Sequence, residues 1–151
     1  MSINTDAPIR VYTDMCADLC HYGHFEFLST LHETAQSLYP DQSIHIVVGI
    51  HSDETIASYK RTPIQTMEER MQMVRFHPNV MEIVPNAPLT ITNEYLASRG
   101  IDHVGIGGGK SDEVLDTMYG SISVPKSYIA YTDTVSTTEL IQRCVAHSQY
   151  T

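Results

Sequence analysis

Short apolar segments alternate along the chain with stretches in which apolar residues recur every three or four positions. Residues 44–50, IHIVVGI, form an almost continuous β-branched run, which is typical of a strand covered on both faces. Four other short runs share this apolar character and predict further strands. The five predicted strands span residues 9–13, 44–50, 80–84, 101–107 and 126–132.

The segments between these strands have the periodicity of amphipathic helices. A helix is predicted from Gly23, with its apolar face formed by Leu28, Leu31, Ala35 and Leu38. Capping boxes, Thr66 with Glu69 and Ser136 with Glu139, predict two more helix starts. Four helices are therefore predicted. The first begins at Gly23, and the second extends over 66–76 with Met67, Met71 and Val74 on one side. The third extends over 91–100 with Gly100 as the closing residue, and the fourth over 136–148.

Strand–helix alternation in a chain of 151 residues predicts an α/β fold: one parallel sheet of five strands with helices on both faces. No internal repeat, low-complexity tract or linker interrupts the chain, so we expect a single domain over residues 1–151. In such sheets ligands bind beyond the carboxyl ends of the strands. The loops after the first, second, fourth and fifth strands are therefore expected to share one crevice.

The charge balance limits the classes of partner. Lys and Arg number 9 against 18 Asp and Glu, which gives a net charge of -9, and such a surface repels nucleic acids and anionic membranes. A small anionic ligand is compatible with a few well-placed positive groups. The three cysteines favour a reducing, cytoplasmic location. No apolar run reaches membrane-spanning length, and the N-terminal MSINTDAPIR does not have the apolar core of a signal peptide, so no membrane insertion is expected.

The segment HYGH, residues 21–24, lies where the first strand passes into the first helix. His21 and His24 are three residues apart, and Gly23 lets a phosphate approach the backbone of a helix N-terminus that already favours anions. Two other interpretations are a turn with one capping and one exposed histidine, and a zinc clip with Cys16 and Cys20. The spacing of the cysteines matches no strong zinc pattern, so we expect no metal site. The strand-to-helix position favours phosphate contact.

Further candidates for anion binding occur in the other loops. Lys60 lies in a loop beside Arg61 and suits a phosphate partner, although a solvated surface lysine is the ordinary alternative. Arg70 is one turn into its helix and either faces the crevice or pairs with Asp53. The hydroxyl and N–H groups of Ser136, Thr137 and Thr138 at the start of the last helix suit a phosphate as well as a cap.

These groups together indicate phosphoryl chemistry without a covalent protein nucleophile. Neither GxxxxGK[ST] nor GxGxxG occurs in the chain. Nucleotidyl transfer requires positioning of the reactants and neutralisation of charge on the α-phosphate and on the leaving pyrophosphate. Imidazoles, a lysine, helix termini and Mg²⁺ supply these requirements, so Mg²⁺ is expected to accompany the nucleotide.

Four segments, residues 18–24, 47–74, 80–88 and 135–143, resemble the cytidylyltransferase family, which shares the HxGH element with a wider nucleotidyltransferase superfamily. The similarity extends from Val11 to Arg143 and is greatest to a catalytic domain of the branch that uses phosphoethanolamine. It implies a Rossmann-like domain, usually dimeric, that joins CTP and a phosphorylated alcohol to give a CDP-alcohol and pyrophosphate in phospholipid biosynthesis. Phosphocholine and glycerol 3-phosphate are alternative acceptors.

The resemblance also implies roles for individual residues. His21 and His24 would contact the CTP phosphates and stabilise the transition state, and Lys60 would bridge the phosphates of nucleotide and acceptor. Residues 80–85 would contribute to a dimer contact. The positions that would bind the nucleotide are Met15, Cys16, Asp18, Gly23, Arg70, Gly107, Ser136, Thr137 and Thr138.

The chain departs from the family pattern around the phosphates. Met15 and Ala17 stand where the family has a glycine and an aromatic residue, and Tyr131 stands where it has an arginine. After the fourth strand, Gly107–Gly109 replaces a glycine followed closely by an acidic residue. These departures leave two alternatives open: an enzyme with a different base or acceptor, and a relative that binds a nucleotide or a partner without turnover.

Overall fold

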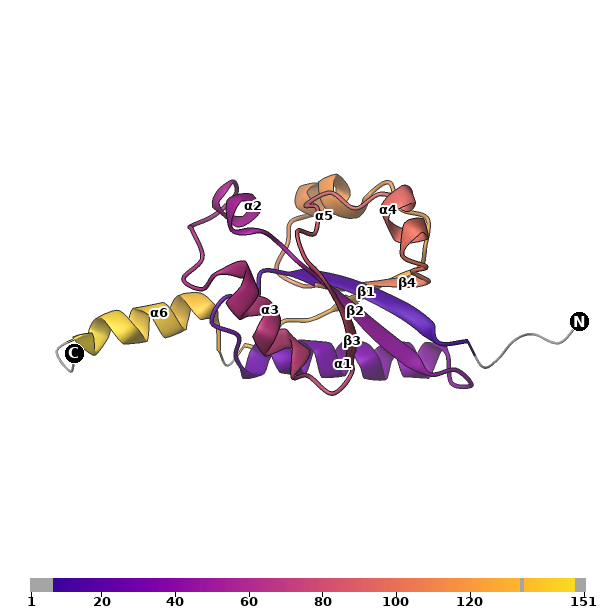
Figure 1. Cartoon of the computed structure of the whole chain (residues 1–151), viewed down its shortest axis with the longest axis horizontal. Helices are drawn as coiled ribbons and strands as arrows, with labels where there is room; N and C mark the ends of the chain where they lie inside the picture. The colour runs from indigo at the N-terminus through magenta and orange to yellow at the C-terminus, as the bar shows by residue number, and fades with distance from the viewer. Residues whose placement is uncertain (1–6, 134, 149–151) are drawn as a thin grey trace, which may run out of the picture.

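The computed structural model describes residues 7–133 and 135–148, and its centre is one parallel β-sheet (Figure 1). The ends of the single domain predicted over 1–151 lie outside the described residues. The strand order is β3-β2-β1-β4-β5. The elements are β1 (Ile9–Met15), α1 (Tyr22–Leu38), β2 (Ile44–Ile50), α2 (Asp53–Ala57), α3 (Met67–Arg75), β3 (Val80–Val84), α4 (Asn93–Ser98), β4 (His103–Gly107), α5 (Asp112–Tyr119), β5 (Lys126–Ile129) and α6 (Thr137–Ala146).

Helices cover both faces of the sheet, as predicted. Figure 1 shows α1 and α3 below the strands, and α4 and α5 above them. The lower core joins Leu28 and Leu31 of α1 and Val74 of α3 to the apolar side chains of β1 and β2. The upper core joins Leu96 of α4 and Met118 of α5 to the opposite face of the strands. The α/β fold with a five-stranded parallel sheet is confirmed.

Most predicted elements are present, with shifted ends. The strands predicted over 44–50 and 80–84 have the predicted bounds, and Thr66 caps α3 in the predicted box with Glu69. The first strand is two residues longer than predicted, and the fourth and fifth are shorter. The fifth ends early because its pairing with the fourth strand ends at Ile129, and Tyr131 lies against Gly109 of the glycine loop instead of continuing the strand.

Three details of the helix predictions are wrong. Leu38 is 55% exposed, because the next residue, Tyr39, packs against the core in its place. At the last helix Ser136 accepts the Glu139 N–H, but the Glu139 carboxylate pairs with Arg143 over 2.7 Å instead of completing the box. Helices α2 and α5 were not predicted, because α2 has only five residues and the buried side chains of α5, Met118 and Tyr119, are confined to its last two positions.

Helix α6 extends away from the sheet (Figure 1) and has no buried residue. Its N-terminus is nevertheless fixed, because the Thr137 hydroxyl donates to the Asp18 carbonyl over 2.8 Å. No helix among the described residues has the length and apolar character needed to cross a bilayer.

Candidate active site

A cleft of about 1120 Å³ opens at the carboxyl ends of the strands. Its walls come from the segments after β1, β2, β4 and β5, so the predicted convergence of these four loops is confirmed. Of the predicted site residues, Asp18 and Arg70 do not line the cleft. Those that do are Met15, Cys16, His21, Gly23, His24, Lys60, Gly107, Ser136, Thr137 and Thr138.

His21 and His24 cap α1 reciprocally. The Gly23 N–H donates to His21 Nδ1 over 3.0 Å, and the His21 N–H donates to His24 Nδ1 over 3.1 Å. The two ring centroids are 4.1 Å apart. Because both Nδ1 atoms accept a backbone proton, we assign the proton of each neutral ring to Nε2. Capping and phosphate contact are thus compatible, since capping uses one nitrogen and leaves the other as a donor.

The local electrostatics keep these rings neutral. Burial, with the neighbouring His21 and the Lys60 ammonium, lowers the pKa of His24 to about 4. Burial also lowers the pKa of His21. At pH 7 the pair therefore presents N–H donors rather than two positive charges.

Gly23 permits this geometry. A Cβ atom at residue 23 would lie 2.9 Å from His21 Cε1 and 3.1 Å from His21 Nδ1, so the ring could not fold back over the first turn. Val135, at 3.4 Å, closes the other side. The glycine in HYGH is therefore required by the position of the preceding histidine.

We predict that Gly23→Ala displaces the His21 ring and lowers kcat/KM by about 100-fold, the typical effect of losing one transition-state donor. The loss of the cap should cost about 1 kcal/mol of unfolding free energy. Steady-state kinetics and urea denaturation measure the two effects. Glu26→Ala, at an exposed position of the same helix, is the control. Unchanged kinetics in Gly23→Ala would contradict the requirement.

Asp18 is buried beside the cleft and does not line it. Its carboxylate, with a side chain 1% exposed, accepts the N–H groups of Ile64 and Gln65 and pairs with Arg61, each over 2.9 Å. Burial raises the pKa of Asp18, but these donors outweigh burial and leave the pKa below its ordinary value. Asp18 thus holds residues 61–65 against the histidine turn. The direct nucleotide contact expected for Asp18 stays a prediction.

This arrangement predicts a pH-dependent contribution to stability. A carboxyl whose pKa is depressed in the folded state stabilises the fold above its unfolded pKa, near 3.8, and loses this effect as the pH falls through the folded value. Asp18→Asn should therefore lower the unfolding free energy by about 2 kcal/mol at pH 7. The difference between variant and parent should shrink below about pH 4, which denaturation at several pH values would measure. An equal difference at pH 3 and pH 7 would contradict this account.

Arg70 is buried and does not line the cleft. Its side chain is 0% exposed and pairs with Asp53 over 2.7 Å, as one of the two interpretations of the sequence proposed. It also donates to the carbonyls of Cys16 at 2.7 Å and His51 at 2.9 Å. The guanidinium thereby ties the ends of β1 and β2 to the start of α3. Direct contact of Arg70 with the nucleotide stays a prediction.

Lysines provide positive charge at the cleft. Lys60 follows α2, with Nζ 5.6 Å from the centroid of the Tyr59 ring. Lys110 follows the glycine loop, and its Nζ donates to the Gly107 carbonyl over 3.2 Å. Burial lowers the pKa of Lys110, and the nearby Asp14 opposes that shift. A Cβ at Gly107 would lie 3.4 Å from Tyr131, so any side chain there would enter the cleft.

Comparison with known proteins assigns the family. The cytidylyltransferase-like family model matches residues 12–143. The chain belongs to this family. It is 37% identical to the ethanolamine-phosphate cytidylyltransferase of Dictyostelium discoideum, over 95% of this chain and 39% of that protein. It is 32% identical to human choline-phosphate cytidylyltransferase A, over 93% of this chain and 37% of that protein.

The chain thus spans about two fifths of the length of these curated relatives. The fold likeness extends to solved structures. The lipopolysaccharide core biosynthesis protein of Thermoplasma volcanium superposes with a TM-score of 0.63 at 18% identity, over 84% of this chain and all of that one. This likeness supports the Rossmann-like fold alone.

Two cleft residues of this cytidylyltransferase-like domain were not selected from the sequence. Asp14, with a side chain 3% exposed, accepts the Tyr119 hydroxyl over 2.7 Å through Oδ1. His51, with a side chain 4% exposed, lies with Nδ1 3.2 Å from the Tyr59 hydroxyl. A polar residue at the carboxyl end of each of two adjacent parallel strands was the available signal.

Proposed function

We propose that this domain transfers the cytidylyl group of CTP to a phosphorylated amino alcohol, with phosphoethanolamine favoured, and releases pyrophosphate. The observation that carries the proposal is the reciprocal histidine cap, which gives two neutral Nε2–H donors to a cleft that also contains Lys60 and Lys110. Family membership supports the same chemistry. Hydrogen-bond donors of this kind stabilise negative charge on phosphoryl oxygens, and no covalent intermediate with the protein is required.

In the proposed reaction a phosphate oxygen of the acceptor attacks the α-phosphorus of CTP. The new P–O bond forms as the bond to the bridging oxygen breaks, and pyrophosphate leaves with the electron pair. His21 and His24 donate to phosphate oxygens whose charge increases in the transition state, while Lys60 draws the two anionic substrates together. Ser136 accepts the Glu139 N–H, and the N–H groups of Thr137 and Thr138 in the first turn of α6 suit the leaving phosphates.

Mg²⁺ is proposed to enter with CTP. In the part of the chain that the structure describes, no three His, Cys, Asp or Glu side chains gather closely enough to hold a metal ion. The residues present therefore fit an Mg²⁺ coordinated mainly by phosphate oxygens and water, as is common for this ion. When bound, it would neutralise triphosphate charge.

The acceptor is proposed to carry a positive charge. Asp14 offers one carboxylate oxygen, Oδ2, that has no hydrogen-bond partner among the described residues. An unpaired buried carboxylate oxygen fits a cationic group far better than the neutral hydroxyls of glycerol 3-phosphate. This favours phosphoethanolamine, whose ammonium carries both a positive charge and N–H donors, over glycerol 3-phosphate.

Two observations favour turnover over the alternative of binding alone. Met15 replaces a family glycine, but its φ is not positive, so the larger side chain strains no backbone there. The left-handed positions in this turn are Ala17, at φ 58°, and Leu19, at φ 48°. Lys110 also supplies a cation near the strand-four loop.

The test is direct. Purified protein with Mg²⁺, CTP and either phosphoethanolamine or phosphocholine should release pyrophosphate, and a panel of the four nucleoside triphosphates establishes the base preference. Calorimetric CTP binding without product from any acceptor would support the binding-only alternative. Absence of both binding and turnover in the folded protein would refute the proposal.

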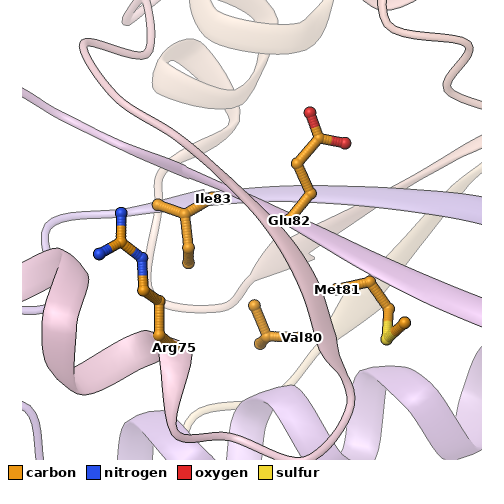
Figure 2. A pocket seen from close by; sticks show the side chains of 5 residues that line it. All are labelled: Arg75, Val80, Met81, Glu82 and Ile83. Carbon is orange, nitrogen blue, oxygen red and sulfur yellow. The ribbon is translucent and has the colours of Figure 1, made fainter.

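We further propose a homodimer formed through the β3 edge. Met81 is 58% and Phe76 is 76% exposed, and β3 is the last strand on its side of the sheet. Beside it, Arg75, Val80 and Met81 contribute to a hollow of about 270 Å³ (Figure 2). An unpaired edge with exposed apolar side chains is typical of an interface.

Met81→Glu is expected to shift the protein from dimer to monomer in sedimentation-velocity experiments, because it places a charge in the proposed contact. Tyr128→Glu, on the opposite edge strand β5 and 63% exposed in the parent, is the matched control and should leave the dimer intact. A parent protein that sediments as a monomer would refute the dimer.

A cytoplasmic location is proposed from the thiols. Cys16, Cys20 and Cys144 are all free cysteines. Such thiols persist in a reducing compartment. Cell fractionation, with recovery in the cytosolic fraction, is the test.

A further inference from the structure

Two buried atoms beside the cleft have no hydrogen-bond partner among the described residues, Asp14 Oδ2 and His51 Nε2. They are 3.8 Å apart, which is too far for a direct hydrogen bond. Both side chains line the cleft and are less than 5% exposed. Buried polar groups are nearly always paired, so two adjacent unpaired atoms at a cleft indicate a ligand group that binds between them.

The surroundings leave both atoms able to accept. The Tyr119 hydroxyl donates to the other Asp14 oxygen, Oδ1, and the Lys110 ammonium donates to the Gly107 carbonyl. At His51, Nδ1 lies 3.2 Å from the Tyr59 hydroxyl oxygen. We assign the ring proton to Nδ1, which then donates to this oxygen and leaves Nε2 with its lone pair. A ligand that bridges these two atoms must therefore supply at least two hydrogen-bond donors.

We propose that His51, together with Asp14, selects a primary ammonium group on the acceptor and discriminates against a quaternary one. This inference rests on the proposed transfer to a phosphorylated amino alcohol and makes its acceptor specific. A primary ammonium brings three N–H donors, so it can satisfy Asp14 Oδ2 and His51 Nε2 together. A trimethylammonium brings none and would leave both acceptors buried and unpaired.

The two tyrosines that contact Asp14 and His51 do so through their hydroxyl groups. Quaternary groups are recognised by the faces of aromatic rings. The Tyr119 hydroxyl donates to Asp14, and the Tyr59 hydroxyl oxygen is the partner of His51 Nδ1. At Asp14 and His51 a quaternary ammonium would therefore meet hydrogen-bond acceptors and the hydroxyl ends of these two tyrosines, and the Tyr59 ring already has Lys60 Nζ 5.6 Å from its centroid.

The first experiment uses the unmodified protein and varies the number of N–H donors on the acceptor. Calorimetry in the presence of CTP measures the binding of phosphoethanolamine and of its N-methyl, N,N-dimethyl and N,N,N-trimethyl derivatives, with three, two, one and no N–H donors. Two acceptors predict a small change on the first methylation and a large loss on the second. Phosphoethanolamine should bind at least about 100-fold more tightly than its N,N,N-trimethyl derivative. An affinity that rises or stays constant along the series overturns the proposal.

The second experiment tests His51 itself. His51→Phe keeps the ring volume and removes Nε2, so it should weaken phosphoethanolamine about tenfold while changing the phosphocholine affinity little. His51→Gln retains an acceptor and should recover part of the preference. His103→Phe is the matched control, because His103 is 2% exposed and bonded to Tyr39 and Ser127 outside the cleft. Its acceptor preference should equal that of the parent.

The outcomes separate this inference from the proposed function. Selective binding of the primary amine without pyrophosphate release would refute the transfer reaction and leave the ammonium site standing. Pyrophosphate release together with an unchanged acceptor preference in His51→Phe would support the transfer reaction and refute the ammonium site. A His51→Phe variant whose KM for CTP rises while its acceptor preference stays constant would assign His51 to the nucleotide and overturn the proposal.

Discussion

Replacing His24 by alanine is expected to lower kcat/KM about a thousandfold. In the proposed mechanism its Nε2–H donates to a phosphate oxygen that gains charge in the transition state, and loss of one such donor typically costs 10²- to 10³-fold. The effect should be at the upper end, because the His24 ring also positions His21: its Nδ1 accepts the His21 N–H over 3.1 Å. Steady-state kinetics with CTP and phosphoethanolamine measure this change.

Positioning and catalysis by His24 can be separated with His24→Asn. The asparagine Oδ1 can take the place of Nδ1 and accept the His21 N–H, but no donor replaces Nε2–H. Alanine should therefore lose about 1 kcal/mol of unfolding free energy together with activity, whereas asparagine should lose activity and retain stability. A His24→Asn variant with parental kcat/KM would contradict a donor role for Nε2.

The pH dependence provides a second measurement on His24. Its pKa is lowered from 6.5 to about 4 in the folded protein, so protonation favours the unfolded state. The neutral ring thus contributes stability above about pH 6.5, and this contribution declines as the pH falls towards 4. The stability of the parent should decrease more over this range than that of His24→Asn. Equal slopes would show that His24 titrates normally.

The sequence was informative about the fold where one periodicity applied to a whole element. The run 44–50 has its predicted bounds because every residue of β2 except His45 is buried between two helical layers. Helix α5 was missed because its contribution to the core comes from its last two residues, Met118 and Tyr119. Leu38 was wrongly assigned to the buried face, because periodicity does not show where a helix ends. The helix ends at Leu38, and the next residue, Tyr39, packs against the core instead.

For the site, the sequence identified groups that lie in loops but not the distances between them. His21, His24 and Lys60 were selected for their chemistry and the order of the strands, and the structure brings all three to one cleft. Asp14 and His51 were missed because each is an ordinary polar residue at a strand end. Their significance comes from burial and from an unpaired atom on each, which only the folded arrangement provides.

Arg70 illustrates the opposite case, a residue assigned to the nucleotide whose side chain is fully buried. Its guanidinium has four acceptors: the Gln65, Cys16 and His51 carbonyls and the Asp53 carboxylate. The carbonyls of Cys16 and His51 belong to the two turns that carry HYGH and the proposed ammonium site. We infer that Arg70 acts on the proposed substrate sites through these two turns, without direct contact.

Arg70→Met is expected to lower the unfolding free energy by about 3 kcal/mol or more, because it removes a buried partner and leaves carbonyl groups unpaired. Arg70→Lys keeps the charge but not the planar set of donors, and should fall between the parent and Arg70→Met. Arg143→Met is the control. It breaks an exposed pair at 2.7 Å, with a side chain 55% exposed, and should cost less than about 1 kcal/mol. Urea denaturation measures all three variants.

Kinetics on the folded fraction distinguish positioning from direct contact. If Arg70 acts through the turns it holds, Arg70→Lys should raise KM for both CTP and the acceptor, since the Cys16 and His51 carbonyls move together. If Arg70 instead binds the nucleotide, only KM for CTP should rise in Arg70→Lys. The latter result would require the guanidinium to leave Asp53 and turn into the cleft when CTP binds.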